Sequence, residues 1–344
     1  MDGMRWIHAD ADLVELRELT LIDDADMQVD IKSSAALIDN TWSITVSEKV
    51  WSEEPILEGH YIYCPGTEWG GPVTLIKHVT ASHQVTVQGP TWRGLLYQRR
   101  IYPPAGQGYK VITDEDAEDL IADIVGQSMG TIFAIGGELS GVTVSAQYRY
   151  QSYAVGLQTV LADNGLRLDI VFDNTIPYPA AVLSAKPIST LEDVEISQDY
   201  GINFTSLIGN VELANHCLAL GGGELAERTV LEVYRVGTEY YTTRPETLPV
   251  EDLRTVLLDY GAAETTDELM KSAIERLEAT APQQSIQINE LPLGVEMNIG
   301  DQINVRDRLT GLVALSEVTQ KILTIKQGVT KIDTEISVLY IKSA

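Results

Sequence analysis

The sequence has 344 residues, of which 44% are apolar, and its 50 acidic and 24 basic side chains give a formal charge of −26. That length exceeds what one hydrophobic core usually serves, so it predicts two or three domains. The negative charge argues against any role that depends on binding nucleic-acid phosphates.

The chain shows no sign of export or membrane insertion. No stretch approaches the ~20 apolar residues of a membrane span, and the N-terminus (MDGMRWIHADADLVEL) lacks the basic start and apolar run of a secretory signal. Cys64 and Cys217 stand far apart without CxxC spacing, which argues against a disulfide framework and a zinc ribbon. We expect synthesis and folding in a cytoplasm.

The first hundred residues alternate like strands. Residues 26–32 (DMQVDIK) place Met27 and Val29 on one face and Asp30 on the opposite, polar face. Residues 41–47 (TWSITVS) and 83–89 (HQVTVQG) repeat this pattern. Alternation with one polar face predicts antiparallel sheet or barrel strands.

The middle of the chain mixes helices and strands. Residues 112–127 predict a helix that Thr113 can cap. A second helix is predicted from Ser152 to the Asn164-Gly165 pair, followed by a strand over 166–173 (LRLDIVFD).

Later segments predict strands around a helical pair. Apolar spacing predicts helices over 249–261 (PVEDLRTVLLDYG) and over 265–282, the second with a Thr265 to Glu268 capping box. Strands are expected before this pair from about residue 191, and after it from residue 285 to the C-terminus.

Two segments share a weak internal scheme. Residues 58–89 and 299–328 each have a glycine at the second position (Gly59, Gly300), then a short strand and a loop that ends in a glycine (Gly71, Gly311). A last strand is closed by Gly89 or Gly328. A duplication predicts this scheme, but chance also produces it, because period-two strands and glycine turns recur in any β protein.

The sequence offers no clear chemistry. His8, Asp10 and Asp12 alternate in HADAD, but a solvated acidic strand start explains them better than a metal site does. GxSxG, HExxH, P-loop and GxGxxG patterns are all missing from the sequence. We therefore predict no catalytic residues, no metal and no cofactor.

Four stretches of the sequence carry a resemblance to a known family: ADLVELREL, DNTWSITVS, PILEGHYIYCPGTEWGGPVTLIKH and GPTWRGLLYQRRIYPP. Together they resemble the tail-associated, or baseplate hub, proteins of siphophages and prophages of Gram-positive bacteria. These proteins are similar in fold to the central hub of contractile-tailed phages. The C-terminal GDQINVRDRLTGLVALSEVTQKILTIKQG resembles the end of the same module, so the likeness covers nearly the whole chain in order.

The resemblance implies an α+β, β-rich fold with two related β-barrel tube domains and an α/β insertion between them. The corresponding boundaries are 1–100 for the first barrel, 101–190 for the insertion, 191–245 with 283–344 for the second barrel, and 246–282 for a helical segment. It implies a structural hub, not an enzyme, whose trimer forms a pseudo-hexameric ring at the virion tail tip. That ring docks on the tail tube or a distal tail protein, contacts other tail-tip or fibre proteins, and lets DNA pass without specific binding.

Residues 91–104 (TWRGLLYQRRIYPP) gather three arginines in an acidic chain. Because arginine makes bidentate contacts with carboxylates, Arg93, Arg99 and Arg100 are candidates to clamp acidic partners, with Trp92 and Trp69 as further interface candidates. The partner carboxylates lie either within the subunit, at the domain junction, or on the next subunit. The sequence leaves both arrangements open.

Two other functions stay open. Exposed tryptophans and tyrosines on a β scaffold suit a receptor-binding or cell-wall-carbohydrate-binding tail component. A cell-wall hydrolase is the second alternative, although the sequence does not single out its carboxylates.

Overall fold

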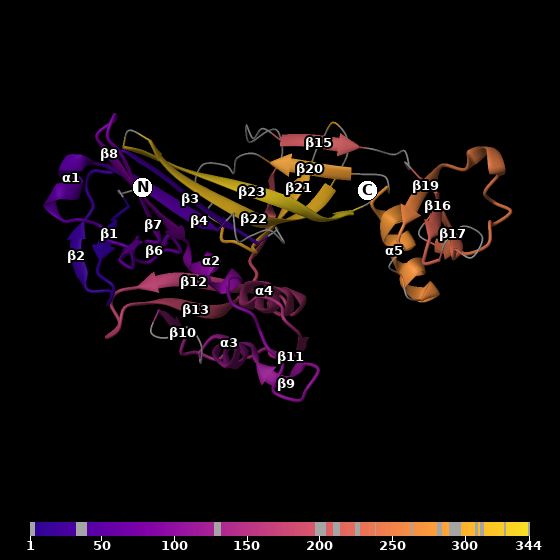
Figure 1. The fold of residues 1–344 in the computed structure, drawn as a ribbon, viewed down its shortest axis with the longest axis horizontal. Helices are drawn as coiled ribbons and strands as arrows, with labels where there is room; N and C mark the ends of the chain where they lie inside the picture. Colours follow the sequence, from indigo (N-terminus) through magenta and orange to yellow (C-terminus); the bar gives the residue numbers. More distant parts are fainter. Residues whose placement is uncertain are drawn as a thin grey trace. The chain divides into compact units, whose positions relative to one another are not determined.

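The computed structural model describes residues 4–31, 40–126, 132–196, 204–208, 214–223, 228–237, 239–261, 263, 265–280, 284–288, 297–306, 309, 313–326 and 328–342 (Figure 1). The chain divides into two compact units, Met1–Phe204 with Gln287–Ala344, and Thr205–Ile286. Among the described helices, none is both long and apolar enough to span a bilayer.

An eight-stranded sheet dominates the first unit. Its strands run in the order β14-β21-β22-β3-β4-β8-β7, and β23 also pairs with β22. They are β3 (Asp24–Asp30), β4 (Thr41–Ser47), β7 (Leu75–Val79), β8 (Gln84–Pro90), β14 (Thr190–Ile196), β21 (Gln302–Arg306), β22 (Val313–Lys326) and β23 (Val329–Lys342).

Strands from the two ends of the chain meet in this sheet. β22 pairs antiparallel with β3, so that Gln320 lies opposite Asp30 and Lys326 opposite Asp24. The β-rich class expected from the sequence is confirmed. Among the described residues the sheets are open, and the two closed barrels expected from the resemblance stay a prediction.

A smaller sheet has the order β2-β1-β5-β6. It consists of β1 (Ile7–Ala9), β2 (Glu15–Glu18), β5 (Tyr61–Tyr63) and β6 (Gly70–Pro72). A short helix, α1 (Glu48–Glu53), follows β4 directly because the Ser47 side chain accepts a hydrogen bond from the Val50 backbone N–H.

Residues 110–187 combine helices and strands in an α/β layer. One face of the sheet β10-β13-β12 packs on two helices, and β9 pairs with β11. The elements are β9 (Lys110–Asp116), α3 (Ala117–Val125), β10 (Phe133–Ile135), β11 (Thr143–Tyr148), α4 (Tyr153–Asp163), β12 (Leu166–Asp173) and β13 (Ala180–Pro187).

The helices of this layer begin and end largely where the sequence indicates. Ser152 caps α4, and Asn164 ends it before Gly165, which has a positive φ of 73°. The first helix differs: α3 begins after Asp116, whose carboxylate accepts from the Glu118 N–H. The predicted cap Thr113 lies inside β9, because residues 110–116 pair with β11.

The second unit has its own core. Its sheet order is β18-β17-β16-β19, formed by β16 (His216–Leu220), β17 (Val230–Val236), β18 (Glu239–Tyr241) and β19 (Thr255–Asp259). Helix α5 (Thr266–Glu278), capped by Thr265 as predicted, packs Leu269, Ala273 and Leu277 against Cys217 and Val233. Cys64 and Cys217 are buried free thiols.

The predicted helix over 249–261 is wrong. This stretch forms a short 3-10 turn, η3 (Val250–Asp252), and then β19, which pairs in parallel with β16. Two further strands, β15 (Phe204–Ile208) and β20 (Gln284–Ile288), pair with each other and bracket the second unit in the sequence.

The opening part of the weak sequence scheme corresponds to a repeated backbone motif, whereas its closing glycines do not, because Gly89 lies within β8 and Gly328 between β22 and β23. Gly59 and Gly300 have φ values of 84° and 88°, and their N–H groups donate to Val73 O and Val318 O, both at 2.9 Å. In each copy the next residue then accepts from that same valine: His60 O from the Val73 N–H at 2.8 Å, and Asp301 O from the Val318 N–H at 2.9 Å.

The strands after the two glycine turns follow the same order. β5 pairs with β6 as β21 pairs with the first part of β22. β7 then pairs with β8, as the second part of β22 pairs with β23. The copies differ outside this core, because β1 pairs antiparallel with β5 whereas β14 pairs in parallel with β21.

Candidate functional site: the polar junction around Arg93

The arginine-rich stretch begins with helix α2 (Trp92–Tyr97). Thr91 starts it by accepting a hydrogen bond from the Gly94 N–H at 3.2 Å, and its own N–H donates to Asn40 O at 3.0 Å. Gly94 allows this approach, since a Cβ there would lie 2.3 Å from Asn40 O. The helix is thereby fixed against the start of β4.

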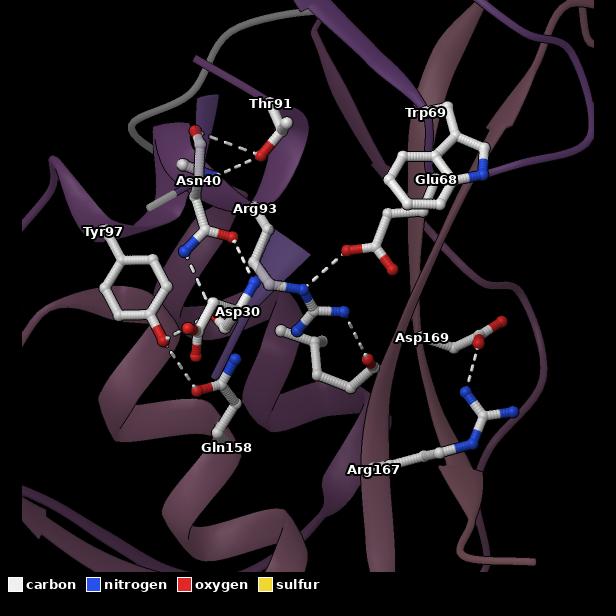
Figure 2. Close-up of polar contacts among 12 residues, drawn as sticks. Asp30, Asn40, Glu68, Trp69, Thr91, Arg93, Tyr97, Gln158, Arg167 and Asp169 are labelled. Carbon is white, nitrogen blue, oxygen red and sulfur yellow. Dashed lines mark hydrogen bonds and ion pairs between the residues drawn. The ribbon is translucent and has the colours of Figure 1, made fainter. Parts of the chain in front are cut away.

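Arg93 points inward from α2 and is only 1% exposed. Its Nε lies 2.6 Å from Glu68 Oε1, and its Nη2 donates to Leu168 O on β12 at 3.2 Å (Figure 2). Burial by itself lowers the pKa of this guanidinium, but the Glu68 carboxylate more than offsets it and raises the pKa overall. Arg93 therefore stays charged and ties helix α2 to β12 of the α/β layer.

A second set of buried polar groups at this junction is centred on Asp30, at the end of β3. Asn40 and Asp30 exchange two hydrogen bonds, Asp30 N to Asn40 Oδ1 at 3.0 Å and Asn40 Nδ2 to Asp30 O at 2.9 Å. Gln320 Nε2 donates to Asp30 Oδ2 at 3.0 Å. The Tyr97 hydroxyl lies 3.3 Å from Asp30 O and 3.2 Å from Gln158 Oε1 (Figure 2). These bonds join β3, α2, α4 and β22.

The two tryptophans named from the sequence lie in the core. Trp92 is fully buried and stacks with Phe172 at 5.0 Å and with Tyr61 at 6.0 Å between ring centres. Trp69 is 4% exposed and lies near Glu68 (Figure 2). Both rings are packed inside the protein, and neither is exposed to a partner.

A further ion pair connects β12 of the α/β layer to the residue before β21. Arg167 on β12 contacts Asp169, and its Nε lies 3.0 Å from Asp301 Oδ1 without the angle of a hydrogen bond. Asp301 follows the Gly300 turn and also accepts from Ser189 N at 3.0 Å and Asn298 N at 2.8 Å. Its carboxylate orders the entry to β21.

The three predicted clamp arginines separate into two kinds. Arg93 is an internal clamp, one of the two arrangements left open by the sequence, whereas Arg99 and Arg100 are exposed. The sequence reasoning missed Asp30, Asn40 and Gln320. One signal was present: an aspartate in a strand otherwise flanked by apolar residues.

The histidines and carboxylates form no metal site in the described part of the chain. His8 is buried and lies 2.8 Å from His60, Nε2 to Nδ1. Asp10 accepts from the backbone N–H groups of Asp12 and Val14, both at 2.9 Å, and so orders a turn. Near α1, the Glu48 carboxylate contacts His78 at 2.7 Å and His83 at 2.9 Å, and these contacts lower the pKa of Glu48.

One open hollow lies on the outer face of β12 and β13. Its lining combines Asp169 and Asp173 with Val171, Val182 and Lys186. Asp169 already contacts Arg167, and Asp173 accepts from the Thr175 backbone N–H and hydroxyl, both at 2.7 Å, which lower its pKa. These carboxylates are held as structural acceptors.

Comparison with known proteins places the fold. No protein-family model and no curated protein match the sequence. The structure is similar to the 43 kDa tail protein of prophage MuSo2 from Shewanella oneidensis, with a TM-score of 0.51 and 12% identity over 97% of this chain and 98% of that one.

Two further solved structures are similar over most of their length. They are prophage tail protein gp18 from Listeria monocytogenes EGD-e (TM-score 0.48, 14% identity, 98% and 95% covered) and a tail protein from Neisseria meningitidis MC58 (0.45, 12%, 96% and 96%). At such sequence identities a structural likeness shows the fold alone. We base the assignment of the fold on the Shewanella protein. The chain has a phage-tail fold, which confirms the resemblance predicted from the sequence.

Proposed function

We propose that the protein is a structural component of a phage or prophage tail and forms the hub at the tail tip. The observation that carries the proposal is the match to the Shewanella prophage tail protein, which spans nearly the full length of both chains. Its partners in this role are the tail tube or a distal tail protein on one face and other tail-tip or fibre proteins beyond.

The repeated motif supports a ring of three subunits with pseudo-sixfold order. The strands that follow the Gly59 and Gly300 turns have the same order. Two like modules in each chain give a trimer six modules, which can match the six subunits of a hexameric tail tube. We place the first module within 1–100 and the second within 191–204 with 287–344, each closing into a barrel only in the assembled ring. Residues 205–245, which the sequence assigned to the second barrel, belong to the compact unit Thr205–Ile286. Residues 101–190 are then an insertion on the outside.

The polar face of the eight-stranded sheet suits a DNA channel. Asp26 lies beside Ser43, and Asp24 beside Thr45, whose hydroxyl meets that of Thr86 at 2.9 Å. Hydroxyls and carboxylates dominate this stretch, with Lys326 opposite Asp24 and Lys77 opposite Thr86 on the same face. The carboxylates repel phosphates. We assign it to the lumen, where DNA slides without specific contacts.

The alternative functions receive less support. Four of the five tryptophans are buried, so a carbohydrate-binding surface built on exposed indoles loses most of its candidates. The hydrolase alternative requires a pair of free, facing carboxylates, and those lining the hollow on β12 and β13 are held by Arg167 and Thr175. The proposed role involves no chemistry.

Electron microscopy of particles tests the proposal. A peptide tag on an exposed turn, such as the one at Gly237 between β17 and β18, lets an antibody mark the protein on tails released by the host. Label at the tip of the tail is expected, and deletion of the gene removes assembled tails. Label along the tail shaft, on the capsid or on no particle contradicts the hub assignment.

A further inference from the structure

An exposed arginine–tyrosine patch remains unexplained by the junction. It consists of Arg99, Arg100, Tyr102, Tyr109, Arg149 and Tyr150, all exposed, with Tyr102, Tyr109 and Tyr150 at 67%, 46% and 53%. Buried tyrosines are common in this chain. Three exposed ones beside three arginines are not accounted for by the fold.

Backbone pairing brings the two halves of the patch together. Ile101 N donates to Gln151 O and Tyr150 N to Ile101 O, both at 2.9 Å, and Arg100 forms a β-bridge with Ser152. The side chains then stack: Tyr102 meets Tyr150 edge-on at 5.9 Å between ring centres. Arg149 Cζ lies 5.7 Å from the centre of Tyr109 and 5.8 Å from that of Tyr150.

The patch lacks carboxylates in a chain that is rich in them. Residues 69–113 and 139–162 contain no aspartate or glutamate, although the chain has 50. Over the described residues, no carboxylate lies within ion-pair distance of Arg99, Arg100 or Arg149, whereas the nearby Lys110 pairs with Asp123 at 2.6 Å. The three guanidinium groups are therefore available to an outside anion.

Arginine and tyrosine are the residues enriched where proteins bind one another, because they bring contact area and directed hydrogen bonds together. The complementary surface must offer carboxylates beside aliphatic side chains. The segment 12–21 of this same chain, which we call the acidic edge, does so. It has exposed Asp12 and Glu18 around β2, of which Glu18 also pairs with Arg5 at 3.0 Å, and exposed aliphatic residues, Val14 (58%), Leu16 (39%) and Leu21 (67%).

The acidic edge and the patch lie toward opposite ends of the first unit, as the positions of β2 and of β9 with β11 show (Figure 1). A contact between them therefore has to join two copies. Two different faces that meet head to tail generate a ring when the rotation closes. We propose that the arginine–tyrosine patch of one copy docks on the acidic edge of the next copy. This contact rests on the ring of subunits proposed above.

Light scattering and sedimentation of purified variants test this contact. The patch variant carries Arg99→Glu, Arg100→Glu and Arg149→Glu. A control with the same charge change carries Lys49→Glu, Lys77→Glu and Lys271→Glu, all exposed and outside both surfaces. We expect the patch variant to associate at least about tenfold more weakly than the wild type, and the control to stay within about twofold. Both variants should keep the unfolding midpoint of the wild type.

A rescue variant identifies the acceptor. Asp12→Lys and Glu18→Lys added to the patch variant restore opposite charges across the contact and should restore association. A patch variant that associates like the wild type overturns the docking proposal and leaves the ring standing. A rescue that fails removes the acidic edge as acceptor and so overturns the contact as stated. A wild type that stays monomeric at every concentration overturns the self-contact, whereas labelling of tails decides the hub role separately.

Discussion

At the residue scale, Arg93 shows how one buried cation joins segments that are distant in the sequence. Its guanidinium contacts Glu68 and Leu168 O while its helix is capped against Asn40. A buried ion pair contributes little beyond a well-packed apolar pair, but breaking one partner of it is costly. Arg93 thus acts mainly by making the junction specific.

We expect Arg93→Met to lower the free energy of unfolding by about 3 kcal/mol, because Glu68 and Leu168 O lose their buried donor. Arg99→Met is the matched control, and its exposed side chain should change stability by less than about 0.5 kcal/mol. Urea denaturation followed by circular dichroism measures both. Equal effects of the two changes would show that the Arg93 pair is not what holds the junction.

A second prediction at this scale concerns His8. Burial, followed by the nearby His60, lowers its pKa from 6.5 to about 4, while Arg17 adds to this effect and Asp10 opposes it. Below pH 6.5 the unfolded chain binds a proton at His8 that the folded chain does not bind until about pH 4. The free energy of unfolding is therefore fully retained above pH 6.5 and falls as the pH drops toward 4, by at most about 3 kcal/mol.

Comparing urea midpoints at pH 7 and pH 5 for the wild type and His8→Gln isolates this contribution. His216 is also a buried histidine with a lowered pKa, caused by burial, and it titrates in both proteins, so it cancels in the difference. The variant should lose less stability on acidification than the wild type. A parallel loss in both proteins would assign the pH dependence to other groups.

Asp30 marks the limit of sequence reasoning for single residues. Alternation in 26–32 correctly predicted a strand with Met27 and Val29 inward, but it placed Asp30 on a polar, exposed face. In the structure Asp30 is 7% exposed, because Asn40 and Gln320 satisfy its polar atoms. Those partners are set by tertiary contacts, which a local pattern does not contain.

At the scale of elements, local patterns were reliable where caps and periodicity agreed. Helices α4 and α5 begin at the predicted caps Ser152 and Thr265. The helix predicted over 249–261 is wrong, although its apolar residues have helical spacing: Leu253, Val256, Leu257 and Tyr260. Thr255 and Val256 favour strands as well, and pairing of β19 with β16 outweighs the helical pattern.

The two glycine turns give a matched test at this scale. Both have positive φ, so Gly59→Ala should destabilise by about 1 kcal/mol through backbone strain alone, since nothing lies within 4 Å of its added Cβ. Gly300→Ala adds a contact of 2.9 Å with Arg167 Cβ and should cost more. Thermal unfolding of the two variants ranks them, and a larger effect at Gly59 would contradict the packing described at Asp301.

At the scale of the whole molecule, the phage-tail fold was foreseeable from stretches of sequence, whereas the continuous sheet was not. The resemblance predicted two separate β modules, and pairing of β3 with β22 places strands of both in one sheet. No local signal reports a pairing across nearly 300 residues. The division into domains stays a prediction.

The polar sheet face leads to a prediction about DNA release. Asp24→Lys with Asp26→Lys places cations where we expect phosphates to pass, so release from phage particles should slow. Glu58→Lys with Asp163→Lys, both exposed and outside this sheet, makes the same charge change as a control. DNA release can be followed by dye fluorescence. Unchanged kinetics in the Asp24 and Asp26 variant would place this face away from the channel.

The pairing of β3 with β22 also sets a schedule for biosynthesis. Asp30 finds Gln320 only after 290 further residues have been joined, which takes about 15 to 60 s at ribosomal speeds. Throughout that interval the outer edge of β3 has no native neighbour, and a bare edge can pair with another nascent polypeptide. Chaperone demand should therefore begin once β3 has emerged and last until β22 leaves the exit tunnel.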